Sequence, residues 1–81
     1  MVDVNVRLEL LRRIYCLGLQ DIRNAFGDDK HILDKYEACR KNCEGGYGNY
    51  KFIFDLDSDN AITLFKSIGY VGVDLREKIG R

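Results

Sequence analysis

Three aspartates in the second half of the chain have the types and spacing that could support metal chemistry. Asp55, Asp57 and Asp59 alternate along the sequence, as the first carboxylate ligands of a calcium-binding loop do. However, Asn60 stands where such a loop needs a glycine, and Lys66 stands where a bidentate glutamate must complete the coordination shell. Because a lysine ammonium repels a bound cation, we predict no calcium site here.

The segment Phe52-Ile-Phe-Asp-Leu-Asp57 resembles the first motif of the haloacid dehalogenase superfamily. The resemblance implies an apolar strand that ends in a nucleophilic Asp55 and a general acid/base, Asp57. It is confined to this segment: Ser58-Asp59 follows where the family has Gly-Thr, and only 24 residues come after Asp57 to supply the family's lysine and magnesium ligands. We therefore interpret these acids as a strand end and a helix cap, and we predict no catalytic residues and no enzymatic activity.

Two cysteines and a histidine raise the question of a zinc site. Cys39 and Cys43 are one helical turn apart, and His31 precedes them on the same predicted helix. Zinc needs about four converging ligands, usually with two-residue spacing within a pair, and that spacing is missing. Buried cysteines commonly act as small hydrophobic residues. We predict no metal site and no cofactor, and leave metal binding by Cys39 and Cys43 as an alternative.

Size and charge narrow the class of protein. The 81 residues suit a single domain (1–81) with one small core. The 13 basic and 13 acidic residues cancel, whereas a free-standing nucleic-acid binder usually has a basic excess. The polar N-terminal residues do not form a signal peptide, no apolar run is long enough for a membrane span, and three cysteines suit a reducing compartment. We expect a cytoplasmic protein.

The hydrophobic pattern predicts a small α+β fold. Val4, Leu8, Leu11 and Tyr15 recur at helical spacing, and the helices are expected at about 4–17, 19–26 and 29–43. A strand–helix–strand unit is expected at about 50–56, 59–68 and 70–74, since apolar residues alternate from Tyr50 to Leu56. A hairpin spanning 51–68 is the alternative. The four residues 45–48 are expected to form a flexible, glycine-rich connector.

Residues 19–41 can also be aligned with a helix-turn-helix, with Gly27 at the turn. A DNA-binding regulator is therefore our alternative function. Against it, the candidate recognition helix opens with Asp28 and Asp29, which would face phosphates. For it, four cations would contact DNA from one face of the protein: Lys30, Lys35, Arg40 and Lys41.

Our leading hypothesis is a small non-enzymatic protein-binding module, such as an inhibitor, adaptor or accessory protein, of a size common in phages and mobile elements. Tyrosine is enriched in protein interfaces because its rigid ring adds contact area at low entropic cost. Beside the glycine-rich segment we expect five partner-binding residues: Tyr47, Asn49, Tyr50, Arg40 and Lys41. A sheet of two strands would also leave an edge to cover, which favours a homodimer.

Overall fold

The computed structural model describes residues 4–42 and 46–79, and these form six helices with no strand among them. In chain order the helices are α1 (Val4–Tyr15), α2 (Leu19–Phe26), α3 (Lys30–Asn42), α4 (Gly46–Asp55), α5 (Ser58–Ser67) and α6 (Arg76–Ile79). The predicted α+β fold is therefore wrong. No helix in this part of the chain has both the length and the apolar character needed to cross a membrane.

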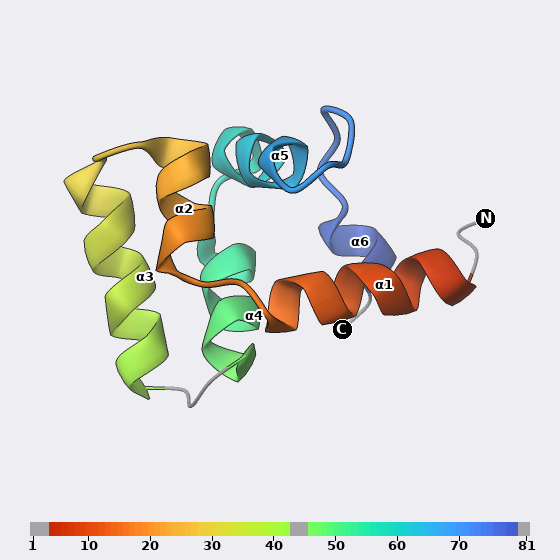
Figure 1. Cartoon of the computed structure of the whole chain (residues 1–81), viewed down its shortest axis with the longest axis horizontal. Coiled ribbons are helices and arrows are strands. Elements are labelled where there is room, and N and C mark those ends of the chain that lie inside the picture. Colours follow the sequence, from red (N-terminus) through yellow and green to blue (C-terminus); the bar gives the residue numbers. More distant parts are fainter. Residues whose placement is uncertain (1–3, 43–45, 80–81) are drawn as a thin grey trace.

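The helices pack as a bundle in which α4 is central. Helix α4 contacts α3 on one side and α1 on the other, α2 contacts α3 and α5, and the short α6 lies on α1 (Figure 1). One cluster of buried side chains joins all six helices. It consists of Leu10, Ile14, Leu17, Ile22, Ile32, Tyr36, Cys39, Phe52, Ile53, Leu56, Ala61, Leu64, Phe65 and Ile79.

The first predicted strand is the helix α4. Phe52, Ile53 and Leu56 are buried with Asn49, at the i, i+3, i+4 and i+7 spacing of one helical face. Phe54, which an alternating strand would bury beside Phe52, is 40% exposed. The spacing of apolar residues in this segment fits both the alternation of a strand and the period of a helix. The segment is helical because that form packs its apolar face between α1 and α3.

The glycine-rich segment was also wrongly predicted, since Gly46 begins α4 instead of belonging to a flexible connector. A Cβ atom placed on Gly46 would lie only 2.2 Å from the Cδ2 atom of the Tyr15 ring. Glycine therefore permits the close approach of α4 to the end of α1. Gly45 lies outside the described residues.

The ends of α2, α3 and α5 follow local sequence signals. The Asp21 carboxylate accepts a hydrogen bond from the Gly18 amide at 2.9 Å, and Asp29 caps α3 by accepting one from the Ile32 amide at 3.2 Å. The predicted helix at 59–68 is α5, so the hairpin alternative is wrong. Helix α5 ends at Ser67, and Gly69 follows its C-cap with a φ of 105°, in the left-handed region that favours glycine.

The second predicted strand, at 70–74, is an irregular segment between α5 and α6. Its ends are fastened to the bundle. Arg13 of α1 donates a hydrogen bond to the Ile68 carbonyl, and its guanidinium lies 5.8 Å from the centre of the Tyr70 ring. Because the described part of the chain has no sheet, the argument for a homodimer from an exposed sheet edge no longer applies.

Candidate functional site

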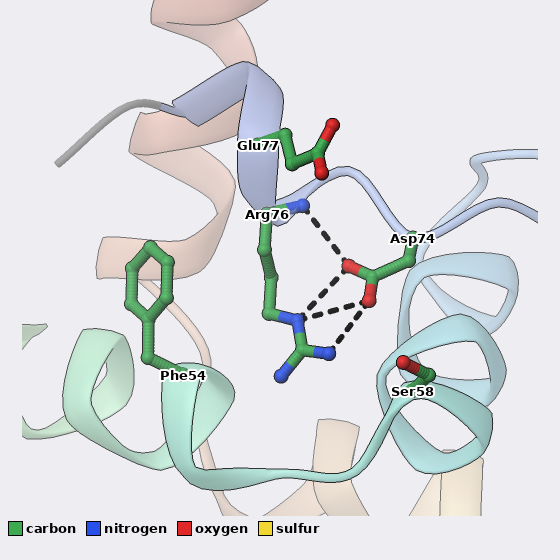
Figure 2. A pocket seen from close by; sticks show the side chains of 5 residues that line it. All are labelled: Phe54, Ser58, Asp74, Arg76 and Glu77. Carbon is green, nitrogen blue, oxygen red and sulfur yellow. Dashed lines mark hydrogen bonds and ion pairs between the residues drawn. The ribbon is translucent and has the colours of Figure 1, made fainter.

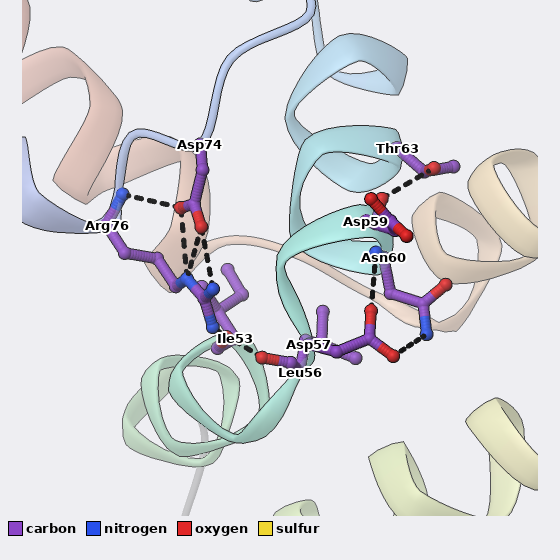
Figure 3. A network of polar contacts seen from close by, with 8 residues as sticks. All are labelled: Ile53, Leu56, Asp57, Asp59, Asn60, Thr63, Asp74 and Arg76. Carbon is purple, nitrogen blue, oxygen red and sulfur yellow. Dashed lines mark hydrogen bonds and ion pairs between the residues drawn. The ribbon is translucent and has the colours of Figure 1, made fainter.

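The aspartates that resemble a catalytic motif lie at the junction of α4 and α5, where one of their side chains caps a helix. Asp57 caps α5, because its carboxylate accepts a hydrogen bond from the Asn60 amide at 2.8 Å (Figure 3). Asp55 ends a helix instead of a strand, so the resemblance to the dehalogenase motif does not extend to its structure. The Asp59 backbone carbonyl accepts a hydrogen bond from the Thr63 hydroxyl at 2.9 Å.

The candidate metal ligands are not brought together. Cys39 is buried in the core between α3 and its neighbours, whereas His31 is exposed. Cys43 lies outside the described residues. Within the residues that the structure describes, no group of three histidine, cysteine, aspartate or glutamate side chains is arranged to hold a metal ion.

A cavity of about 460 Å³ lies between α4, α5 and α6, and is lined by Phe54, Ser58, Asp74, Arg76 and Glu77 (Figure 2). Two of its charged side chains, Asp74 and Arg76, are already engaged. Arg76 donates from Nε and Nη2 to the Asp74 carboxylate at 3.0 and 2.6 Å, and from Nη1 to the carbonyls of Ile53 and Leu56 at the end of α4 (Figure 3). A cation at this position also complements the helix dipole.

This pairing shifts the pKa values of both side chains. The hydrogen bond from the Arg76 side chain lowers the pKa of Asp74, against the opposing effect of burial. The same bond raises the pKa of Arg76. The Asp74–Arg76 pair is thus a clamp that fastens the 70–75 segment to the end of α4, and its donors are directed at the protein.

The predicted partner-binding residues lie on two helices, Arg40 and Lys41 near the end of α3 and the other three at the start of α4. They divide into exposed and buried groups. Tyr47 is 70% exposed, and Arg40 and Lys41 are also exposed. Tyr50 is half-buried, and Asn49 is buried with 1% exposure. Asn49 is therefore not accessible to a partner in this structure, and the role of the five residues in binding stays a prediction.

Asn49 fastens α4 to the end of α1. Its Nδ2 atom donates to the backbone carbonyls of Ile14, Tyr15 and Leu17 at 2.9, 3.1 and 3.0 Å. The last carbonyls of a helix have no partner within the helix, so a side-chain donor satisfies them. The Oδ1 atom of Asn49 is buried and has no hydrogen-bond partner among the described residues, so the side chain is oriented by its donor end alone.

Tyr50 makes a second connection between the same helices. Its hydroxyl donates to the Leu11 carbonyl at 2.7 Å. Burial raises the pKa of the Tyr50 phenol, and the neighbouring Tyr15, Cys16 and Tyr47 raise it further. The neutral phenol, which retains the donor proton, is therefore the form that the fold favours.

Above these buried connections lie two exposed tyrosine rings, from helices far apart in the sequence. The centres of the Tyr15 and Tyr47 rings are 6.0 Å apart, and the ring planes meet edge to face at 84°. Tyr15 is 49% exposed and Tyr47 is 70% exposed. We call these two rings the tyrosine surface.

Sequence reasoning missed Tyr15, because the predicted apolar face of α1 included Leu8, Leu11 and Tyr15. The buried residues are instead Leu10, Ile14 and Leu17. Both rows have helical spacing, so periodicity could not separate them. An aromatic residue at the polar edge of a helix was the available signal.

The described helices 19–26 and 30–42 supply the helix pair that the DNA-binding alternative requires. The exposed side of α3 does not form a basic surface, since Asp34 and Glu37 lie between Lys30 and Lys41. Phosphate neutralisation would be opposed by these carboxylates. Comparison of the chain with protein-family models, curated proteins and solved structures gave no match.

Proposed function

We propose that the chain is a small non-enzymatic protein-binding module that contacts its partner through the tyrosine surface. The observation that carries the proposal is the pair of exposed, mutually packed rings of Tyr15 and Tyr47. Large aromatic side chains are the commonest energetic anchors of protein interfaces. Exposed apolar surface that is contiguous commonly marks an interaction site.

Rigidity of the support strengthens this proposal. Each ring stands on a helix, and the two helices are joined beneath the rings by the hydrogen bonds of Asn49 and Tyr50. A partner that binds to such preorganised rings has little conformational entropy to remove. The glycine at Gly46, which leaves room for the Tyr15 ring, belongs to the same arrangement.

Each of the two helices also carries an exposed row of residues that includes its tyrosine. Each row has an apolar residue at both ends and a cation between them, at helical spacing that places them on one face. All are exposed: Leu8, Arg12 and Tyr15 on α1, and Tyr47, Lys51 and Phe54 on α4. The rows fit a partner surface that combines apolar side chains with carboxylates.

The surroundings of the aspartates support a non-enzymatic role. Asp57 is engaged in capping α5, and Asp74 is engaged by Arg76. In the cavity beside them, the Arg76 guanidinium donates to backbone carbonyls at the end of α4. These groups stabilise helix ends.

Site-specific photo-crosslinking tests the proposal. A benzophenone amino acid is placed at Tyr47, and in a control variant at Thr63, which is exposed on α5. In cells of the source organism, we expect one crosslinked protein from position 47 and none from position 63. With the partner purified, Tyr47→Ser should weaken binding at least about tenfold, as the loss of an aromatic anchor does.

Each other outcome decides the question as well. A crosslinked species with twice the mass of the chain identifies a second copy as the partner and supports the proposal. Crosslinks to nucleic acid, equal labelling from both positions, or unchanged affinity after Tyr47→Ser would each reject it.

A further inference from the structure

An open cleft lies between the start of α2 and the last turns of α3. It has a volume of about 400 Å³ and is lined by Leu19, Tyr36, Glu37, Arg40 and Lys41. Leu19 is 37% exposed, although it is a large apolar residue. Leu19 gives the cleft an apolar surface, and Glu37, Arg40 and Lys41 give it a charged rim.

Arg40 is held in position on this rim. Its Nη1 atom donates to the Tyr36 hydroxyl at 3.1 Å, and its guanidinium lies 5.7 Å from the centre of the Tyr36 ring. Tyr36 is itself fixed, because it is 1% exposed and its hydroxyl donates to the Leu17 carbonyl at 3.2 Å. The guanidinium is therefore oriented by the core of the protein.

The remaining donors of Arg40 have no hydrogen-bond or ion-pair partner among the described residues. A planar guanidinium with two free donors matches the geometry of a carboxylate. Lys41 adds a second cation, and Glu37 is the one carboxylate on the rim. The rim thus has a net positive charge of about one unit at neutral pH, which suits one carboxylate better than a dianionic phosphate.

We infer that this cleft binds a side-chain carboxylate of an acidic peptide segment, in which glutamate or aspartate adjoins an apolar residue. The carboxylate pairs with Arg40, and the apolar residue covers Leu19. The inference rests on the proposed function for the class of partner. It adds a second contact with the partner. The two contacts are connected through the Leu17 carbonyl, which accepts hydrogen bonds from both the Tyr36 hydroxyl and the Asn49 amide.

The test titrates the isotopically labelled protein with three peptides and follows its backbone amide resonances. The first peptide alternates leucine with glutamate and is blocked at both ends. The second has glutamine in place of glutamate, and the third is the glutamine peptide with a free terminal carboxylate. We expect the first peptide alone to shift the resonances of Leu19 and residues 37–41.

Variants locate the interaction. Arg40→Gln should weaken binding of the glutamate peptide about tenfold or more, because it removes a charge-assisted hydrogen bond. Glu37→Gln should strengthen binding, because it removes the competing carboxylate. Tyr36→Phe should weaken binding while Arg40 is still present, since it removes the acceptor that orients the guanidinium. Arg23→Gln, on the exposed side of α2, is the matched control and should change nothing.

Several results would overturn the inference. They are equal binding of the glutamate and glutamine peptides, binding of the free-terminus peptide alone, displacement by inorganic phosphate at equal concentration, or unchanged affinity in a folded Arg40→Gln protein. Because this titration does not involve Tyr47, its failure leaves the crosslinking result standing. Conversely, a failed crosslink from position 47 with intact peptide binding rejects the tyrosine surface and not the cleft.

Discussion

Replacing Asn49 by alanine should destabilise the protein by about 3 kcal/mol. The substitution removes the two N–H donors of a side chain that is 1% exposed and serves three backbone carbonyls. Two buried hydrogen bonds are worth about 2 kcal/mol together, and an orphaned carbonyl costs about 1 kcal/mol more.

The orphaned carbonyl is that of Tyr15. The Ile14 carbonyl still accepts from the Leu17 amide at 3.2 Å, and the Leu17 carbonyl still accepts from the Tyr36 hydroxyl. The loss is set against a total stability of about 4–12 kcal/mol for a domain of this size. It should lower Tm by about 12–24 °C.

Urea and thermal unfolding followed by far-ultraviolet circular dichroism measure this change. Asn24→Ala is the matched control, because Asn24 is exposed on α2, and it should alter stability by less than about 0.5 kcal/mol. Asn49→Asp keeps the shape but loses the donors, so it should be at least as destabilising as alanine. The reasoning is refuted if Asn49→Ala and Asn24→Ala have the same stability, or if Asn49→Asp resembles the original protein.

Three further substitutions test the same region and the Asp74 clamp, all by urea unfolding. Tyr50→Phe removes a half-buried hydrogen bond and should cost about 1 kcal/mol. Gly46→Ala should destabilise the protein because the new Cβ atom meets the Tyr15 ring, but should stabilise it in a Tyr15→Ala background, where alanine's better helix propensity remains. Arg76 lowers the pKa of Asp74, so the ionised carboxylate stabilises the fold at pH values above its ordinary pKa of 3.8. This stabilisation is lost as the pH falls through the lower pKa of the folded state. Asp74→Asn should therefore be less stable at neutral pH, and its stability should depend less on pH in the acid range.

Each of these three predictions has a control variant and a result that would contradict it. Tyr47→Phe removes a hydroxyl that has no hydrogen bond in the described structure, so it should leave the stability unchanged. An equal loss of stability in Tyr47→Phe and Tyr50→Phe would contradict the Tyr50 prediction. Destabilisation by Gly46→Ala both in the original protein and in the Tyr15→Ala variant would contradict the Gly46 prediction. Asp34→Asn, at an exposed position, should keep the original acid dependence; the same flattening in both aspartate variants would contradict the third.

The parts of the fold that could be predicted are those with local causes. Helix α2 begins and ends where the sequence indicated, because Gly18 and Gly27 bound a short amphipathic segment. Helix α5 is preceded by the capping Asp57 and followed by Gly69. These signals act within a few residues and do not depend on the rest of the chain.

Helix α4 could not be predicted for a complementary reason. Two glycines in its first turn weaken any local preference for a helix, and the alternating aromatic residues favour a strand. What makes the segment helical is the space between α1 and α3, into which Phe52 and Ile53 are packed. That space is defined by α1 and α3, which the local sequence of the segment does not specify.

The candidate site shows the same division. The exposure of Tyr47, Arg40 and Lys41 could be anticipated from residue type. The role of Asn49 could not, because a buried amide is recognised only when the carbonyls at the end of α1 are known to lie beside it. The tyrosine surface likewise needs the close approach of two helices that are separated by α2 and α3 in sequence.

The central structural claim is that α4 is a helix whose Asn49 amide holds the end of α1 beneath the tyrosine surface. Nuclear magnetic resonance of the isolated protein measures it directly. The account predicts helical carbon chemical shifts from Gly46 to Asp55, and Asn49 side-chain amide protons that exchange slowly and lie close to Tyr15 and Leu17. Strand-like shifts over this segment, or an Asn49 amide that exchanges as fast as that of Asn24, would contradict it.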